Sequence, residues 1–132
     1  MEKRLKRARR VLDVMSQLHG IEQQKKLALQ RRHEELEQSQ RDIIHSLNRD
    51  DALYGLFIDT SARFLKSQAQ EAKRVSEATD AQSRRVLDRA RTMKTAERLT
   101  IALDERVTRS RKERELHDII ERYSTRRGAS LP

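Results

Sequence analysis

Apolar residues recur at helical spacing through the first third of the chain. Steps of three, four and three residues connect Val11, Val14, Leu18 and Ile21, and the stripe drifts on through Leu29, Leu36, Ile43 and Leu47. Such steps place side chains on one face of an α-helix. Gaps of seven mixed with gaps of eleven stay close to the natural helical period and indicate weak supercoiling. The pattern predicts one long helix over about residues 2–47, in which Gly20 is a weak spot or a close contact.

Polar turn-forming residues end this pattern. The run Asn48-Arg49-Asp50-Asp51 and the later Asp59-Thr60-Ser61 are typical of turns and helix N-caps, because short polar side chains bond nearby backbone N–H groups. We expect a hairpin tip over 48–60, with a short helical turn over 51–57.

A second helical stripe follows the tip. It predicts a helix over about 61–124 and a frayed tail over 125–132, where Gly128 and Pro132 stand. The stripe comprises Leu65, Ala69, Ala72, Val75, Val86, Ala90, Met93, Leu103, Val107, Ile120 and Tyr123.

Composition agrees with a coiled coil better than with a globular core. Charged residues make up 39% of the 132 residues and aromatic residues 3%, and the one proline is the last residue. Long helices that share a narrow apolar seam suit such a chain. The fold class expected is therefore all-α, a single antiparallel two-helix coiled-coil hairpin spanning residues 1–132.

The two predicted helices differ in length, and the difference has a consequence. At 1.5 Å per residue they would span roughly 70 Å and 93 Å, so the start of the first helix would reach only to about residue 105. The stretch near 106–123 would overhang without an internal partner. It carries Val107, Leu116, Ile119, Ile120 and Tyr123 at helical spacing. An apolar stripe without an internal partner predicts an external one.

Motifs for catalysis, cofactors and metals are missing from the sequence. It holds no phosphate-binding glycine loop, and His33-Glu34-Glu35 lacks the second histidine of a zincin helix because position 37 is Glu. Cysteine is absent, which excludes disulfides and cysteine zinc sites. No apolar run reaches the length of a membrane span. We expect no enzyme activity, no cofactor, no metal and no membrane insertion.

The order of segments resembles a known family. A basic start (EKRLKRARRVLDVMSQL), a Gln/Glu/Arg-rich first helix (EQQKKLALQRRHEELEQSQRDI), a tip and a long second helix closing with KERELHDIIERYSTRR are similar to the FliJ/YscO-type stalk proteins of type III export systems, flagellar or injectisome. The resemblance covers nearly the whole chain. It lies in the architecture, the length and the distribution of charged residues along the chain. It implies a cytoplasmic coiled-coil stalk beside the inner-membrane export apparatus.

The resemblance also implies partners and contact residues. One end of the hairpin would enter a hexameric export ATPase, and the rest would reach an export-gate membrane protein and possible export chaperones. Candidates for the ATPase ring are Arg4, Arg7, Arg10, Arg114, Leu116, Ile119, Ile120, Arg122, Tyr123, Arg126 and Arg127. Candidates for the gate or chaperones at the tip are Leu53, Tyr54, Phe57 and Phe64. The arginines could equally serve solubility, and the tip aromatics could equally close the hairpin.

Other functions stay open at this point. A net charge of +9 suits a nucleic-acid binder or a basic membrane-surface helix, although acidic residues are interleaved and few aromatics are present to stack on bases. The basic charge is concentrated in residues 1–10 and 61–100, whereas 11–60 are net acidic. A generic coiled-coil adaptor, in which a second copy covers the overhang, is the other alternative.

Overall fold

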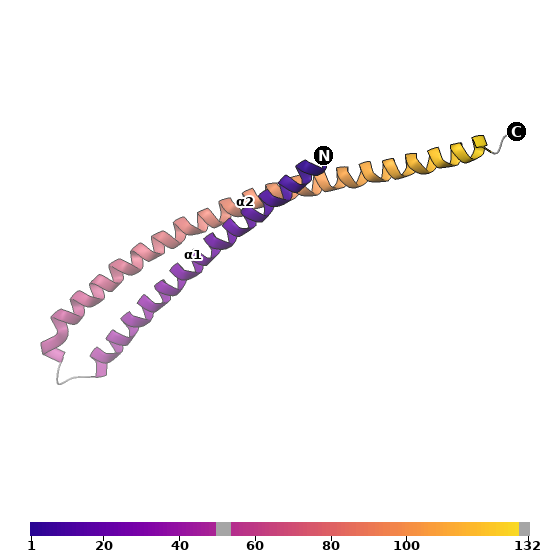
Figure 1. Cartoon of the computed structure of the whole chain (residues 1–132). Coiled ribbons are helices and arrows are strands. Elements are labelled where there is room, and N and C mark those ends of the chain that lie inside the picture. The colour runs from indigo at the N-terminus through magenta and orange to yellow at the C-terminus, as the bar shows by residue number, and fades with distance from the viewer. Residues whose placement is uncertain (50–53, 130–132) are drawn as a thin grey trace. The chain divides into compact units, whose positions relative to one another are not determined.

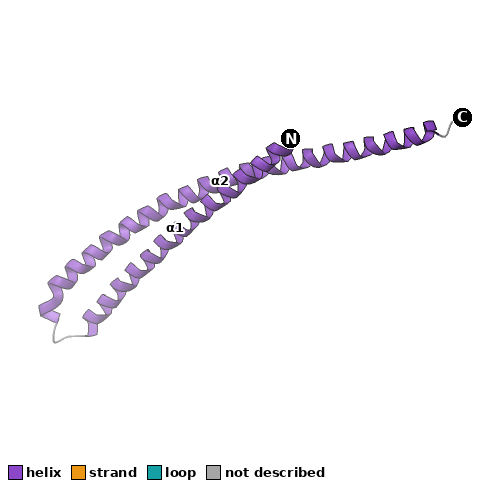
Figure 2. Ribbon diagram, in the orientation of Figure 1, coloured by secondary structure: helices purple, strands orange, loops and turns teal. Residues whose placement is uncertain are grey.

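Two long helices account for the fold. The computed structural model describes residues 1–49 and 54–129, and the side chains of 1–49 and 58–128. Helix α1 spans Glu2–Arg49 and helix α2 spans Tyr54–Ala129 (Figures 1 and 2). No strand occurs among the described residues, and the two helices pack against each other. The expected all-α helical hairpin is confirmed.

Both helices are longer than the sequence pattern predicts. Helix α1 continues to Arg49, and α2 begins at Tyr54 rather than near 61. Residues 50–53, in the middle of the expected tip and at the start of the turn expected over 51–57, lie outside the described residues. Gly55 costs a helix only about 1 kcal/mol, and no proline follows it before residue 132. Helix α2 also includes 125–129, which the pattern assigned to a frayed tail. Arg126 and Arg127 in its last turn complement the negative end of the helix dipole.

The chain divides into two compact units. Met1–Gln17 and Arg91–Pro132 form the first, and Leu18–Ala90 forms the second. Each unit therefore contains a part of α1 and a part of α2.

In the first unit the helices are antiparallel. Arg9 pairs with Asp104 and Glu2 pairs with Arg111, so a step of seven residues back along α1 matches a step of seven forward along α2. The same part of the two helices holds a small core of Leu5, Ala8, Leu103 and Val107. The α2 seam continues at alternating steps of three and four through Met93, Ala96, Thr100, Leu103, Val107 and Ser110. That spacing is the heptad pattern of a coiled coil.

The second unit has a more polar seam. Leu36 and Val75 are its buried apolar residues. Gln82 is also buried, and its side-chain amide donates hydrogen bonds to the backbone carbonyl and the carboxylate of Glu22. The hydrogen bond from the Gln82 amide to the carboxylate lowers the pKa of Glu22 below its ordinary value. The polar side chains limit how much apolar area this unit can bury.

The predicted seam of α1 lies on the wrong face at its start. Of the four predicted seam residues here, Leu18 is half-buried, whereas Val11, Val14 and Ile21 are exposed. Leu12 and Met15, outside the predicted seam, are half-buried. Two apolar stripes run side by side here, each at heptad spacing and one residue apart. Only the stripe in phase with Leu5 and Ala8 meets α2, because the buried pair fixes the helix rotation. Further along, Leu29, Leu36, Ile43 and Leu47 are buried or half-buried, as expected.

Gly20 does not mark a close contact. It lies within α1, and a Cβ built at this position would meet nothing within 4 Å apart from its own helix. Of the two expectations for this residue, only the weak spot fits.

Candidate partner-binding site

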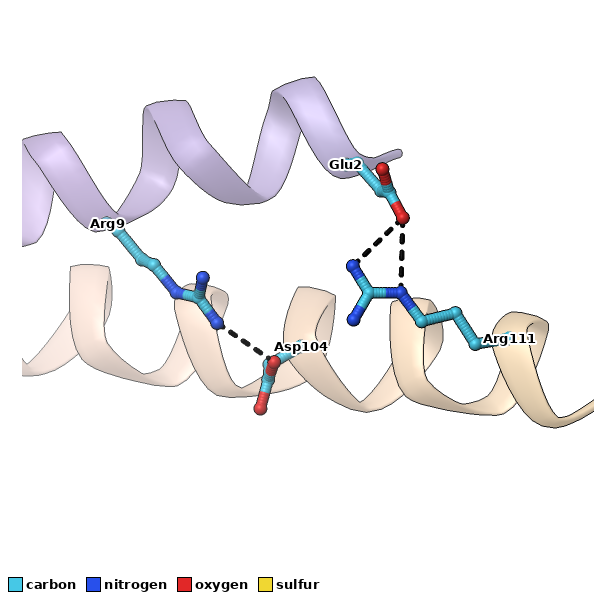
Figure 3. A network of polar contacts seen from close by, with 4 residues as sticks. All are labelled: Glu2, Arg9, Asp104 and Arg111. Atoms are coloured by element: carbon cyan, nitrogen blue, oxygen red, sulfur yellow. Dashed lines mark hydrogen bonds and ion pairs between the residues drawn. The ribbon is translucent and has the colours of Figure 1, made fainter.

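Ion pairs and hydrogen bonds connect the start of α1 to α2. Arg111 donates two hydrogen bonds to one carboxylate oxygen of Glu2, from Nε at 3.2 Å and from an Nη at 3.0 Å (Figure 3). The hydrogen bond and the charge of Arg111 lower the pKa of Glu2 below its ordinary value, with smaller contributions from Arg114 and Lys6. Arg9 donates to Asp104 at 3.2 Å. These contacts mark where the paired part of α2 ends.

Beyond Arg111, helix α2 continues with its side chains exposed to solvent. Ser110 is the last half-buried residue, and every described side chain from Arg111 to Gly128 is exposed. We call residues 112–129 the projecting segment. Figure 1 shows it extending past the N-terminus of α1. Four apolar side chains lie on it, with exposed fractions of 59% at Leu116, 60% at Ile119, 55% at Ile120 and 64% at Tyr123.

These four residues form one face, which we call the projecting stripe. Their spacing of three, four and seven residues places them together on a helix. The stripe is not a continuation of the internal seam. Extending the seam beyond Ser110 at steps of four and three leads to Arg114, His117 and Glu121, all polar. Leu116, Ile120 and Tyr123 each precede a seam position by one residue, about 100° around the helix, and Ile119 lies two residues from both His117 and Glu121, on the opposite side. A longer α1 following the same seam would therefore leave the stripe exposed.

Val107 does not belong to the overhang. Sequence spacing placed it with Leu116, Ile119, Ile120 and Tyr123, but it is 3% exposed and packs in the core with Leu5 and Ala8. The pairing extends to Arg111 rather than stopping near residue 105. The overhang therefore begins several residues later than the pattern predicts.

The predicted arginines fall into two groups in the first unit. Arg4, Arg7 and Arg10 are exposed on α1. Arg114, Arg122, Arg126 and Arg127 are exposed on α2, and all but Arg114 lie near its C-terminal end. The guanidinium of Arg127 lies 5.9 Å from the ring centroid of Tyr123, which joins a cation to the projecting stripe. The structure thus places apolar and basic side chains together on the projecting segment.

The tip candidates are only partly described. Leu53 lies outside the described residues, as do the side chains of Tyr54 and Phe57, whose backbone belongs to α2. Phe64 is 46% exposed on α2 in the second unit. The sequence left two roles open for Phe64, contact with a partner or closure of the hairpin. The exposure of its ring is compatible with both.

A trio of possible metal ligands lies on the projecting segment. Ligand atoms of His117, Asp118 and Glu121 lie within 4.8 Å of one another, and His117 Nδ1 is 3.7 Å from Glu121. All three side chains are exposed on a single helix. Exposed acidic groups at such spacing are ordinary on helices and form ion pairs. They lie on the side of α2 away from the projecting stripe, as the seam positions of His117 and Glu121 show.

The interhelical ion pairs were missed by sequence reasoning, although a signal for them exists. Glu2 and Arg9 are seven residues apart on one helix, and Asp104 and Arg111 are seven apart on the other, with the order of charge matched for antiparallel pairing. Charges that repeat beside an apolar seam are typical of coiled-coil flanks. Aligning the two predicted helices antiparallel so that opposite charges face each other would predict this pairing.

Comparisons with protein-family models, with curated proteins and with solved structures found no match to the chain. Among the described residues, neither helix has a stretch that is both long and apolar enough to cross a membrane.

Proposed function

We propose that the protein is a non-enzymatic stalk and adaptor of a type III export apparatus, which inserts the projecting segment of α2 into a hexameric export ATPase. The observation that carries the proposal is the exposed stripe of Leu116, Ile119, Ile120 and Tyr123 beyond the last residue paired with α1. The family resemblance of the sequence supplies the identity of the partner.

The physical argument rests on what an exposed stripe requires. Four large side chains more than half exposed on one helix face are unfavourable in water unless a partner covers them. The helix presents them in fixed order, so a concave partner can receive them as a helix in a groove. Arg122, Arg126 and Arg127 flank the stripe and would pair with acidic groups around the ring opening.

The second unit carries candidate contacts for the other proposed partners. Phe64 is a candidate contact for the export-gate protein or for export chaperones, together with Leu53, Tyr54 and Phe57. This assignment rests on the resemblance and on the exposure of Phe64. It places the two partner sites in different units of the chain.

The test is a binding measurement between the purified protein and the purified export ATPase of the same organism. Ile119→Asp with Ile120→Asp should reduce binding at least tenfold, since two desolvated apolar contacts become charged ones. Leu87→Asp is the matched control, because Leu87 is 51% exposed but lies in the second unit. Circular dichroism should show unchanged helicity in both variants.

Two results would count against the proposal. Equal loss of binding in the control would mean that binding does not depend on the projecting stripe in particular. Unimpaired binding of the Ile119→Asp, Ile120→Asp variant would remove the stripe from the interface altogether. Binding to duplex DNA instead of the ATPase at 150 mM salt, a concentration near the physiological ionic strength of about 0.15 M, would favour the basic nucleic-acid binder.

A further inference from the structure

The seam of the first unit has two sides that differ in charge. On the side shown in Figure 3, the ion pairs Arg9–Asp104 and Glu2–Arg111 connect the helices. Arg9 and Asp104 each follow a buried seam residue by one position. Each residue turns an α-helix by about 100°, so a residue that precedes a seam residue by one position lies on the other side of its helix. Because the following positions of both helices meet on one side of the seam, the preceding positions of both meet on the other.

This second side carries arginines and apolar residues. We call it the basic flank, and its members each precede a buried or half-buried seam residue: Arg4, Arg7, Val11 and Val14 on α1, and Leu99, Ala102, Arg106 and Arg109 on α2. All of them are exposed, Val14 at 51% and Leu99 at 57%. No acidic residue is among them. The first side is instead balanced, with acidic Glu2, Asp13, Glu97 and Asp104 against basic Lys6, Arg9, Lys94 and Arg111.

The two ion pairs fix the levels at which residues of α1 and α2 meet, since seven residues back along α1 match seven forward along α2. The levels of the basic flank follow from this register: Arg4 with Arg109, Arg7 with Arg106, Val11 with Ala102, and Val14 with Leu99. The four arginines thus occupy two neighbouring levels, about 4.5 Å apart along the helix axis. The apolar side chains occupy the next two levels along α1.

This arrangement is unfavourable without a partner. Like charges at neighbouring positions of a helix repel one another. Within the described ranges 1–49 and 54–129, none of the four arginines of the basic flank takes part in an ion pair. A surface that only keeps a protein soluble mixes both signs, as the first side does. The basic flank instead joins uncompensated positive charge to exposed apolar side chains, so charge complementarity indicates an acidic occupant.

We infer that the basic flank binds an acidic amphipathic helix of a partner protein. Carboxylates of that helix face the four arginines, which can hold them through charge-assisted hydrogen bonds. Its apolar stripe covers Val11, Val14 and Leu99, and the three helices then form a short bundle. This inference does not rest on the export role, because it uses neither the projecting stripe nor the ATPase.

Two other anionic partners fit the basic flank less well. A helix that lies on a membrane has its cations and its apolar stripe side by side along its length. On the basic flank the cations and the apolar residues instead follow each other along the axis. A phosphate backbone would engage the arginines and leave Val11, Val14 and Leu99 exposed. An acidic amphipathic helix satisfies both parts of the flank.

The test uses the full chain with two synthetic helical peptides as probes. The first peptide carries a leucine stripe at helical spacing and glutamates beside it at one end, and the second has lysine in place of every glutamate. The natural protein should bind the glutamate peptide at least about tenfold more tightly than the lysine peptide. Fluorescence anisotropy at an ionic strength of about 0.15 M measures both. Equal affinity for the two peptides would overturn the inference.

Charge reversal on the flank locates the binding site. Arg7→Glu with Arg106→Glu should weaken binding of the glutamate peptide at least about tenfold and strengthen binding of the lysine peptide. The matched control is Arg10→Glu with Arg98→Glu, which changes the net charge equally at exposed positions of the first unit that do not adjoin a seam residue. Circular dichroism should show unchanged helicity in both variants. An equal loss of binding in the control would mean that affinity follows net charge, and would overturn the assignment to this flank.

Neutral substitutions test the apolar part of the flank. Val14→Ser with Leu99→Ser should weaken binding of the glutamate peptide several-fold, because it removes apolar contact without adding charge. Ile101→Ser is the control, since Ile101 is 52% exposed but follows a seam residue and lies on the first side. Unchanged affinity in the Val14→Ser, Leu99→Ser variant would show that charge alone holds the peptide, and would overturn an amphipathic occupant.

The remaining outcomes separate the basic flank from other partners and from the proposed function. Tighter binding of duplex DNA, or of vesicles that contain an anionic lipid, would overturn the inference if the Arg7→Glu, Arg106→Glu variant abolished it. The Ile119→Asp, Ile120→Asp variant should bind the glutamate peptide as the natural protein does. A loss of binding in that variant would place the peptide on the projecting stripe and overturn the inference, whereas ATPase binding is measured independently of either peptide.

Discussion

At the scale of single residues, the same kind of side chain serves two purposes on α2. Val107 and Ile119 are both β-branched apolar residues on α2, and each lies at helical spacing from another apolar residue, Val107 from Leu103 and Ile119 from Leu116. Val107 is buried against Leu5 and Ala8, whereas Ile119 is 60% exposed. The difference comes from phase, because Val107 lies in the seam with Leu103 and Ser110, whereas Ile119 lies out of phase with that seam, on a face of α2 that α1 does not meet. The sequence contains both stripes, but it does not reveal which of them meets α1.

Gly20 offers a prediction at this scale. It lies inside α1 with open space around the position of a Cβ, and its backbone φ is not positive. Glycine in a helix interior costs roughly 0.5–1 kcal/mol relative to alanine. Gly20→Ala should therefore stabilise the protein by about that amount, measured by urea unfolding. A loss of stability would show that something packs against this position. Gly128→Ala, at the exposed end of α2, serves as a control with a smaller effect.

At the scale of the helices, the length of α2 divides it into a paired part and the projecting segment. The paired part carries the buried seam that ends with Leu103, Val107 and half-buried Ser110. The projecting segment has no tertiary packing among the described residues, so its helicity depends on propensity and on continuation from the paired part. The paired part of α2 should therefore determine the stability of the fold, and the projecting segment should determine partner binding.

Two truncations test this separation. A chain ending after Arg114 keeps the seam and the Glu2–Arg111 pair, so its thermal midpoint should stay within a few degrees of the full protein. A chain ending after Ala102 loses Leu103 and Val107, which are 8% and 3% exposed. Deleting buried side chains of this size costs on the order of 2–5 kcal/mol each, so the first unit should unfold at lower temperature. Calorimetry distinguishes the two, and a large loss in the first truncation would contradict the separation.

How far the sequence predicts these elements can be judged from particular residues. The scarcity of breakers and the stripe through Leu36 and Leu47 predict two long helices, which the structure confirms. The exposure of Leu116, Ile119, Ile120 and Tyr123 is also as expected from the unequal helix lengths. The exposed Val11 and Val14 were misassigned to the seam, because two stripes one residue apart have the same period and differ only in which one meets α2.

At the scale of the whole molecule, charge and exposed apolar surface together define what the protein can bind. The net charge of +9 arises from 30 basic and 21 acidic residues, so cations and anions are interleaved along both helices. Such interleaving favours specific protein surfaces over a continuous phosphate backbone. The projecting segment combines this charge pattern with the stripe, and it is the feature on which the proposed export role rests.

The most direct test of the central claim is hydrogen exchange of the full protein, alone and with the purified export ATPase. Alone, at concentrations where it is monomeric, the protein should exchange fastest over 112–129, because few buried contacts protect helical hydrogen bonds there. With the ATPase present, protection should rise over 112–129, and Phe64 and its neighbours should change little. Protection that rises elsewhere, or nowhere while binding is detected by other means, would contradict the claim that the projecting segment is the docking element.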